Sequence, residues 1–94
     1  MEKIDFEKLK KTISCEKQLD KMIEECAELI VTTQHHKQKR ADQEKLIEEM
    51  IDVKILLTQM EELYFVTQKK SFSDWWDKKV KRLNKNMDEY GDVW

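Results

Sequence analysis

The sequence predicts an all-α protein that forms a single small domain. The chain of 94 residues has no proline and one glycine, Gly91, so almost nothing interrupts a helix before its C-terminal end. Charged residues make up 40% of the chain, and Glu, Lys, Leu, Ile and Met are abundant, as is typical of helical proteins. We expect one domain over residues 1–94, with a second copy covering part of its apolar surface.

Helical spacing and capping residues predict two helices in the first part of the chain. The first is expected over about residues 5–11. Ser14 is a suitable N-cap for the second helix, which is predicted to run to about residue 36. The polar stretch 37–41 then predicts a loop.

Two further helices are predicted after this loop. Asp42 is the expected N-cap of the third helix, which is predicted to continue to about residue 68. A break is predicted at 69–71, where Ser71 begins a pattern that resembles a capping box. The fourth helix is then expected over about residues 73–89.

Each of the three longer helices carries a row of apolar residues at helical spacing. Because such rows need partners, we expect these helices to pack as an antiparallel bundle around them. On the second helix the row is Leu19, Met22, Ile23, Cys26, Leu29, Ile30 and Thr33. On the third it is Leu46, Met50, Val53, Leu57, Met60 and Tyr64, and on the fourth Trp76, Val80, Leu83 and Met87.

Charge and hydropathy argue against several classes of protein. With 18 basic and 20 acidic residues the net charge is −2, whereas a dedicated nucleic-acid-binding protein is usually basic. No apolar run approaches the roughly 20 residues that span a bilayer, and the first residues do not resemble a signal peptide. We therefore expect a cytoplasmic protein that binds neither membrane nor nucleic acid, with Cys15 and Cys26 as free thiols.

Two carboxylates of the third helix do not fit the usual solvent-exposed position of acidic residues. Glu49 lies three residues after Leu46 and four before Val53, which places it within or beside the apolar row. Asp52 follows one turn later. A carboxylate that faces a core without a partner is unfavourable by an energy on the order of several kcal/mol, so a basic side chain or a metal ion must compensate it.

Glu25 and Glu28 repeat this pattern on the second helix. Two such pairs on neighbouring antiparallel helices would bring four carboxylates together, and oxygen ligands of this kind select magnesium, manganese or calcium. The calcium-binding loop pattern of EF-hands is absent from the sequence, so magnesium is the expected ion, with manganese as a substitute. The alternative is a bundle whose carboxylates form salt bridges with lysines, namely Lys21, Lys45 or Lys54.

The order of the acidic residues resembles a known family. Residues 24–28 read EExxE, residues 48–52 read EExxD, and twenty residues lie between Glu28 and Glu49. Together with their apolar flanks, these motifs resemble the MazG-like all-α nucleoside triphosphate pyrophosphohydrolase superfamily over about residues 18–57. The resemblance implies a helical bundle that assembles as a homodimer or homotetramer. It also implies magnesium-dependent hydrolysis of a (deoxy)nucleoside triphosphate to the monophosphate and pyrophosphate.

The resemblance assigns roles to individual residues of this chain. Metal ligands would be Glu25, Glu28, Glu49 and Asp52, and Glu25 or Glu28 would accept the proton of the attacking water. The fourth helix is similar to the nucleotide-contact segment of the family. The residues expected to contact the nucleotide are Arg82, Asn86, Tyr90, His35 and Lys79, although an ordinary exposed position is the alternative for each of them.

Two other functions remain open from the sequence. The same scaffold could serve as a non-catalytic helical interaction or regulatory module, which would turn over no nucleotide. A phosphoribosyl-ATP pyrophosphohydrolase is a closer alternative, but the basic and aromatic residues of the fourth helix fit a nucleotide pyrophosphatase better. The base and sugar preferences are not determined by the sequence.

Overall fold

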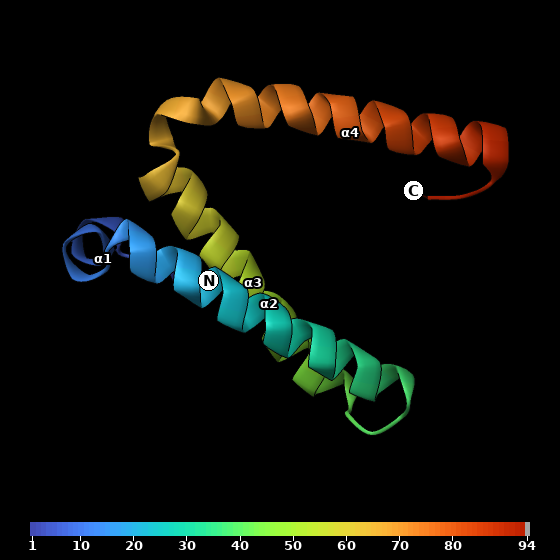
Figure 1. The fold of residues 1–94 in the computed structure, drawn as a ribbon, viewed down its shortest axis with the longest axis horizontal. Helices are drawn as coiled ribbons and strands as arrows, with labels where there is room; N and C mark the ends of the chain where they lie inside the picture. Colours follow the sequence, from blue (N-terminus) through green and yellow to red (C-terminus); the bar gives the residue numbers. More distant parts are fainter. Residues whose placement is uncertain (94) are drawn as a thin grey trace. The chain divides into compact units, whose positions relative to one another are not determined.

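The computed structural model describes residues 1–93, and these residues form helices and short connections without any strand (Figure 1). The α-helices are α1 (Phe6–Thr12), α2 (Cys15–Lys37), α3 (Gln43–Gln59) and α4 (Lys69–Tyr90), with a π-helical turn η1 (Met60–Tyr64) and a 3-10 turn η2 (Val66–Gln68) before α4. The predicted all-α class is confirmed. None of the described helices is both long and apolar enough to cross a membrane. The chain divides into two units, Met1–Tyr64 and Phe65–Trp94, which we describe separately.

Side-chain caps begin the helices of the first unit where the sequence predicts them. The Ser14 hydroxyl accepts a hydrogen bond from the backbone N–H of Lys17 at 3.2 Å. The Asp42 carboxylate accepts one from the backbone N–H of Lys45 at 2.9 Å. Asp5 caps α1 in the same way. Each cap satisfies an N–H group that lacks a partner within the first helical turn.

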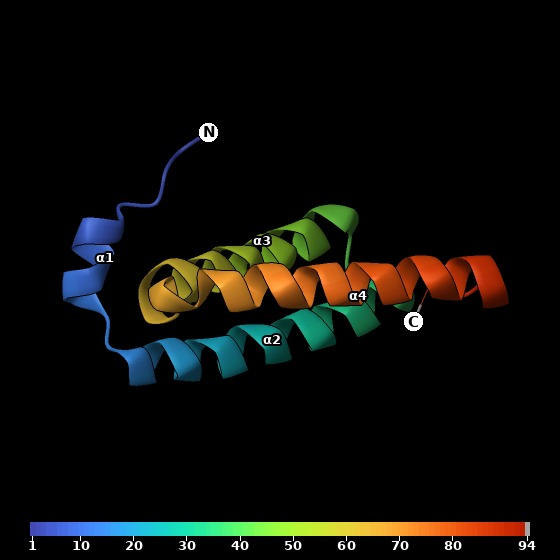
Figure 2. The same cartoon turned by 90° about the horizontal axis from the view of Figure 1, so that it is seen from above.

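Helices α2 and α3 form an antiparallel hairpin, and Figures 1 and 2 show them side by side. Lys39, two residues after the end of α2, has a left-handed conformation, with φ of 61°. The N–H of Arg40 donates to the carbonyl of His35 at 2.7 Å, which closes the end of the helix. His36 Nδ1 lies 3.1 Å from the carbonyl oxygen of Ala41. These local contacts reverse the direction of the chain, so that α3 runs antiparallel to α2.

The contact between α2 and α3 follows a seven-residue repeat. On α2, Gln18 and Thr32 are buried, and Glu25, midway between them, is partly buried. On α3 the buried residues are Glu49 and Leu56, again seven apart. This repeat is the spacing of helices that cross at a small angle, so these five residues define the seam of the hairpin. Partly buried Met22 and Leu29 on α2, and Leu46 and Val53 on α3, lie between them in the sequence or next to them, so the seam is mixed polar and apolar.

The apolar rows predicted as a core are only partly covered within the hairpin, which corrects the expectation from the sequence. The partly buried members are Met22, Cys26, Leu29, Leu46, Val53 and Met60, and the others are exposed. Ile23 is 71% exposed, Ile30 65%, and Met50 and Leu57 are each 53% exposed. Among residues 1–93, Leu56 is the only buried apolar residue. The reason is geometric: these four residues lie one position after Met22, Leu29, Glu49 and Leu56, so they share one side of the hairpin instead of facing its seam. We call them the apolar strip.

The predicted end of the third helix is also wrong. The α3 helix ends at Gln59, and the backbone leaves helical geometry at Phe65, where φ is −111° and ψ is 28°. Aromatic and β-branched residues over 64–67 have low helix propensity, which accounts for a break here. The α4 helix then begins at Lys69, so the expected break and capping box at Ser71 fall inside a helix.

The second unit consists mainly of α4, whose apolar row is largely exposed. Trp76 is 70% exposed and Met87 43%, whereas Val80 and Leu83 are partly buried. Gly91 follows the helix with φ of 62°, a left-handed conformation that suits glycine and ends the helix. The predicted core of this helix is thus not buried within its own unit.

Candidate metal centre

Three carboxylates from the two helices of the hairpin meet at its seam. Glu25 comes from the middle of α2, and Glu49 and Asp52 from one turn of α3. Each residue offers one carboxylate oxygen, and these oxygens all lie within 4.8 Å of one another. Glu25 and Glu49 occupy seam positions, which is why antiparallel packing brings them together.

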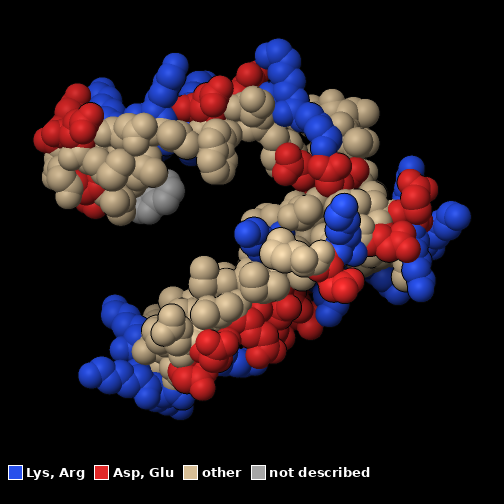
Figure 3. Space-filling model, turned by 180° about the vertical axis from the view of Figure 1, so that it is seen from behind, with Lys and Arg blue, Asp and Glu red and all other residues tan. Residues whose placement is uncertain are grey.

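A second group of carboxylates shares a residue with the first. Glu24, Glu25 and Glu28 also offer oxygens within 4.8 Å of one another. Glu25 belongs to both groups, so three of the four predicted ligands, Glu25, Glu49 and Asp52, meet across the seam, and Glu28 is grouped with Glu25 on α2. Figure 3 shows acidic side chains gathered in a band along the hairpin.

The burial of these groups leaves their negative charge only partly compensated. Glu49 is only 6% exposed, and its Oε2 atom is buried without a hydrogen-bond partner among the described residues. The Oε2 atom of Glu25 is buried and unpartnered in the same sense. Burying an anionic oxygen without compensation is unfavourable by an energy on the order of several kcal/mol. Because carboxylate oxygens are the ligands that magnesium and manganese prefer, the residues present fit such a cation.

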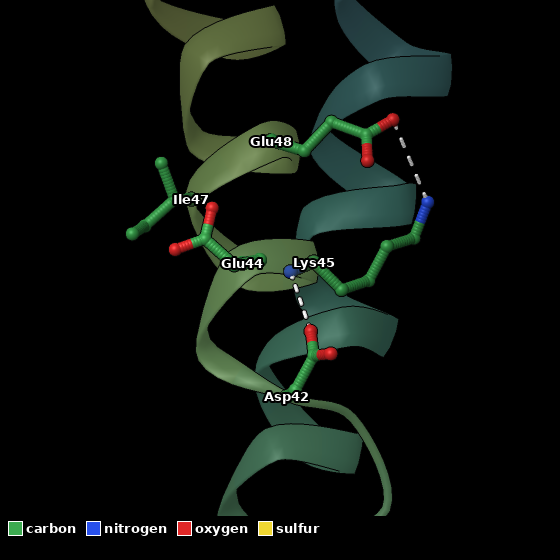
Figure 4. Close-up of a pocket in the computed structure, with 5 residues that line it drawn as sticks. All are labelled: Asp42, Glu44, Lys45, Ile47 and Glu48. Carbon is green, nitrogen blue, oxygen red and sulfur yellow. Dashed lines mark hydrogen bonds and ion pairs between the residues drawn. The ribbon is translucent and has the colours of Figure 1, made fainter.

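Lysine side chains compensate this charge only in part. Lys45 Nζ lies 3.0 Å from Glu49 Oε1 and 3.8 Å from Glu48 Oε1, and the hydrogen bond to Glu49 raises the pKa of Lys45. Figure 4 shows Lys45 reaching toward Glu48 at the start of α3, while Glu44 points to the other side. Lys45 therefore forms one of the salt bridges that the sequence offered as an alternative to a metal ion. It contacts only one of the two carboxylate oxygens of Glu49.

The other two lysines considered from the sequence add little. Lys21 Nζ lies 3.4 Å from Glu24, and both side chains are about half exposed, so this pair is weak. Lys54 forms no ion pair within the part of the chain that the structure describes. Glu25 and Asp52 consequently have no direct lysine partner there.

The clustering of carboxylates changes the titration of Glu25. Partial burial raises the pKa of Glu25, and the nearby carboxylates of Glu28 and Asp52 raise it further. The ionised form of Glu25 is therefore less favourable in the folded protein than in the unfolded chain. Its destabilising effect is absent below the unfolded pKa and develops as the pH rises through the raised, folded pKa.

We accordingly expect Glu25→Gln to raise the melting temperature of the metal-free protein at pH 7, because the substitution removes this repulsion. The gain should disappear below about pH 4, where glutamate is protonated in both states. Thermal unfolding followed by circular dichroism in EDTA would measure both effects. Asp20→Asn, at an exposed position of the same helix, is the control. A lower melting temperature for Glu25→Gln at pH 7 would contradict this account of the cluster.

Two hollows flank the carboxylates. Glu25 and Asp52 belong to the lining of one, with a volume of about 280 Å³. Glu28 and Glu49 belong to the lining of the other, with a volume of about 270 Å³. A ligand bound at the carboxylates could therefore extend to either side.

The remaining predicted site residues lie outside this cluster. His35 is partly buried near the end of α2, where its carbonyl closes the helix. The others are on α4, in the second unit. Arg82 and Tyr90 are exposed there, and Asn86 is partly buried. Lys79 Nζ lies 5.9 Å from the ring centroid of Trp75. Their role as nucleotide contacts stays a prediction.

The sequence interpretation missed several polar residues of this region. Gln18 is 3% exposed with its Oε1 atom buried and unpartnered among the described residues, and Thr32 is also buried. The seven-residue spacing of Gln18, Glu25 and Thr32 is visible in the sequence and could have identified the seam. Gln59, which lines the same hollow as Glu25 and Asp52, could not have been identified from residue spacing, because its position depends on where α3 ends.

Comparison of the chain with protein-family models, with curated proteins and with solved structures gives no match. The candidate site accordingly rests on the chain's own residues. Its main features are the oxygens grouped across the seam and the burial of Glu49. This arrangement can hold a divalent cation and, through it, an anionic ligand such as a phosphate chain.

Proposed function

We propose that the protein hydrolyses a (deoxy)nucleoside triphosphate to the monophosphate and pyrophosphate, with magnesium as the required cation and manganese as a substitute. The observation that carries the proposal is the group formed by Glu25, Glu49 and Asp52, whose buried oxygens include two without a partner among the described residues. The resemblance of the EExxE and EExxD motifs to MazG-like pyrophosphohydrolases supplies the class of substrate.

The carboxylates have two roles in this proposal. Glu25, Glu28, Glu49 and Asp52 would hold the cation, whose charge would offset that of the triphosphate and of the leaving pyrophosphate. The attacking water forms a bond to the α-phosphorus, and the bond from that phosphorus to the bridging oxygen breaks. Glu25 or Glu28 would accept the proton that the water loses.

The nucleotide itself would be held by side chains outside the carboxylate group. On the resemblance of the fourth helix to the family's nucleotide-contact segment, Arg82 and Lys79 are the predicted phosphate contacts and Asn86 and Tyr90 the predicted polar contacts. The sequence contains no glycine-rich phosphate-binding loop, so basic side chains and the cation would have to hold the phosphates.

A substrate panel tests the proposal directly. The full-length protein is incubated with the common ribo- and deoxyribonucleoside triphosphates, with magnesium, with manganese or with EDTA, and products are separated by anion-exchange chromatography. We expect equal amounts of monophosphate and pyrophosphate from at least one nucleotide, and none in EDTA. Release of orthophosphate with a diphosphate, or no turnover of any nucleotide, would contradict the proposal.

A second candidate function is favoured by the apolar strip. Exposed Ile23, Ile30, Met50 and Leu57 form a surface that is typical of a protein–protein interface. We infer that a second copy of the chain covers this strip in a homodimer or homotetramer. A two-fold axis would place the apolar strip of one copy against the same strip of the other, so that a single interface buries both strips. If no nucleotide is turned over, a helical interaction module becomes the better description.

A further inference from the structure

The hollow beside Glu25 and Asp52 has an apolar wall. Leu9 and Ile13 contribute to it from α1 and the residue that follows, and Ile55 and Leu56 contribute from α3. Leu56 is buried, Leu9 and Ile13 are partly buried, and Ile55 is 39% exposed. The hollow is continuous with the candidate metal centre because Glu25 and Asp52 are part of its lining.

Two polar side chains complete the lining of this hollow. Lys21 is one turn before Glu25 on α2, and its ammonium group is partly exposed beside Glu24. Gln59 is the last residue of α3, and its side-chain amide can both donate and accept hydrogen bonds. The hollow thus offers an apolar surface, one cation and one amide next to the carboxylates.

We propose that this hollow is the nucleoside subsite of the enzyme, a proposal that rests on the function proposed above. The base lies against Leu9, Ile13 and Ile55, and the triphosphate extends from the hollow over the carboxylates. Lys21 contacts a phosphate oxygen, and Gln59 hydrogen-bonds the polar edge of the base. At about 280 Å³ the hollow is slightly below the usual range for a complete small-molecule site, which fits a ligand whose charged part lies outside it.

The hollow on the other side of the carboxylates suits a nucleoside less well. It is lined by Ala27, Glu28, Val31, Thr32 and Glu49, which include two carboxylates and no cation. Only Thr32 could hydrogen-bond a base there without adding negative charge. The two hollows therefore provide a matched pair for an experiment: one is expected to bind the nucleoside and the other is not.

Calorimetric binding in the presence of manganese separates the nucleoside contribution from the phosphate contribution. The probes are inorganic triphosphate and the non-hydrolysable α,β-methylene analogues of the four deoxynucleoside triphosphates. For the unchanged protein we expect at least one analogue to bind about tenfold or more tightly than inorganic triphosphate. Manganese binding measured alone reports on the carboxylates independently of any nucleotide.

Filling each hollow in turn then locates the nucleoside. Ile13→Trp should weaken binding of the preferred analogue about tenfold or more, to the level of inorganic triphosphate, while manganese and inorganic triphosphate bind as before. Val31→Trp, which fills the opposite hollow, should leave all three affinities unchanged. Circular dichroism establishes that both variants remain helical.

A smaller substitution tests Gln59 without changing the volume of the hollow. Gln59→Leu removes the amide but keeps the size of the side chain, so it should reduce the difference in affinity between the best and worst base about fivefold, the value of one hydrogen bond. This variant keeps the proposal testable if Ile13→Trp does not fold.

Different results would overturn the subsite and the proposed function. If Val31→Trp weakens nucleotide binding and Ile13→Trp does not, the nucleoside lies on the other side and the subsite is wrong, while the function stands. Equal binding of analogues and inorganic triphosphate by the unchanged protein would also exclude the subsite without affecting the function. If the protein binds neither manganese nor any triphosphate and turns over no nucleotide, both proposals fail.

Discussion

Glu49→Gln is expected to lower magnesium-dependent pyrophosphate release by more than about 100-fold in kcat/KM, because a ligand should matter at least as much as the residues that orient ligands. Glu49 is 6% exposed at the seam, and one of its oxygens is buried without a partner among the described residues. The amide keeps the shape of the side chain but removes the charge that holds a cation. Pyrophosphate release at saturating and limiting nucleotide measures the effect.

The control for this substitution is Glu44→Gln on the same helix. Glu44 is exposed in the first turn of α3 and points away from Lys45 in Figure 4. It should retain full activity and manganese affinity. Circular dichroism should show both variants to be helical, and only Glu49→Gln should lose manganese binding. Full activity in Glu49→Gln would remove the metal centre from the proposed mechanism.

Replacing Ile30 and Leu57 together by glutamate is expected to separate the proposed oligomer into monomers at micromolar concentration. These residues are 65% and 53% exposed, one on each helix of the hairpin. Burying an isoleucine or leucine side chain contributes about 1.5–3 kcal/mol. A dimer would bury four of them, each a little over half exposed beforehand, so at least about 3.5 kcal/mol is lost, which corresponds to roughly two to three powers of ten in Kd. Light scattering during size-exclusion chromatography measures the mass.

Lys17→Glu is a matched control for the oligomer. It changes the net charge of a chain by the same two units but lies on α2 outside the apolar strip. This variant should keep the mass of the unchanged protein. A monomeric mass for the unchanged protein itself at micromolar concentration would contradict the assembly. So would a double variant that keeps the full oligomeric mass.

Local features of the first unit followed directly from the sequence. Ser14 and Asp42 were recognisable as caps because a short polar side chain before an apolar row satisfies backbone N–H groups within three residues. The positions of Glu25, Glu49 and Asp52 in their rows predicted that they would face a neighbouring helix. These inferences depend on spacing along one helix, which the sequence contains in full.

The position of the break before α4 was not predictable in the same way. Residues 59–68 combine good and poor helix formers, so local propensity alone did not fix the end of α3 to within several residues. The structure places a π-helical turn and then a 3-10 turn there, and the rings of Phe65 and Phe72 pair at 5.9 Å. This choice also put Gln59 at the end of α3, beside the candidate site.

By itself the sequence determined the helical class, the caps and the order of the acidic motifs, since each depends on neighbours within one or two turns. Only the tertiary structure decided which side of each helix is buried. A hairpin can cover one strip of each helix, and the covered strip includes Gln18, Glu25 and Glu49, whereas the apolar strip stays exposed. The faces of each helix compete for burial against the other helix, and contacts between residues far apart in the sequence decide which face is buried.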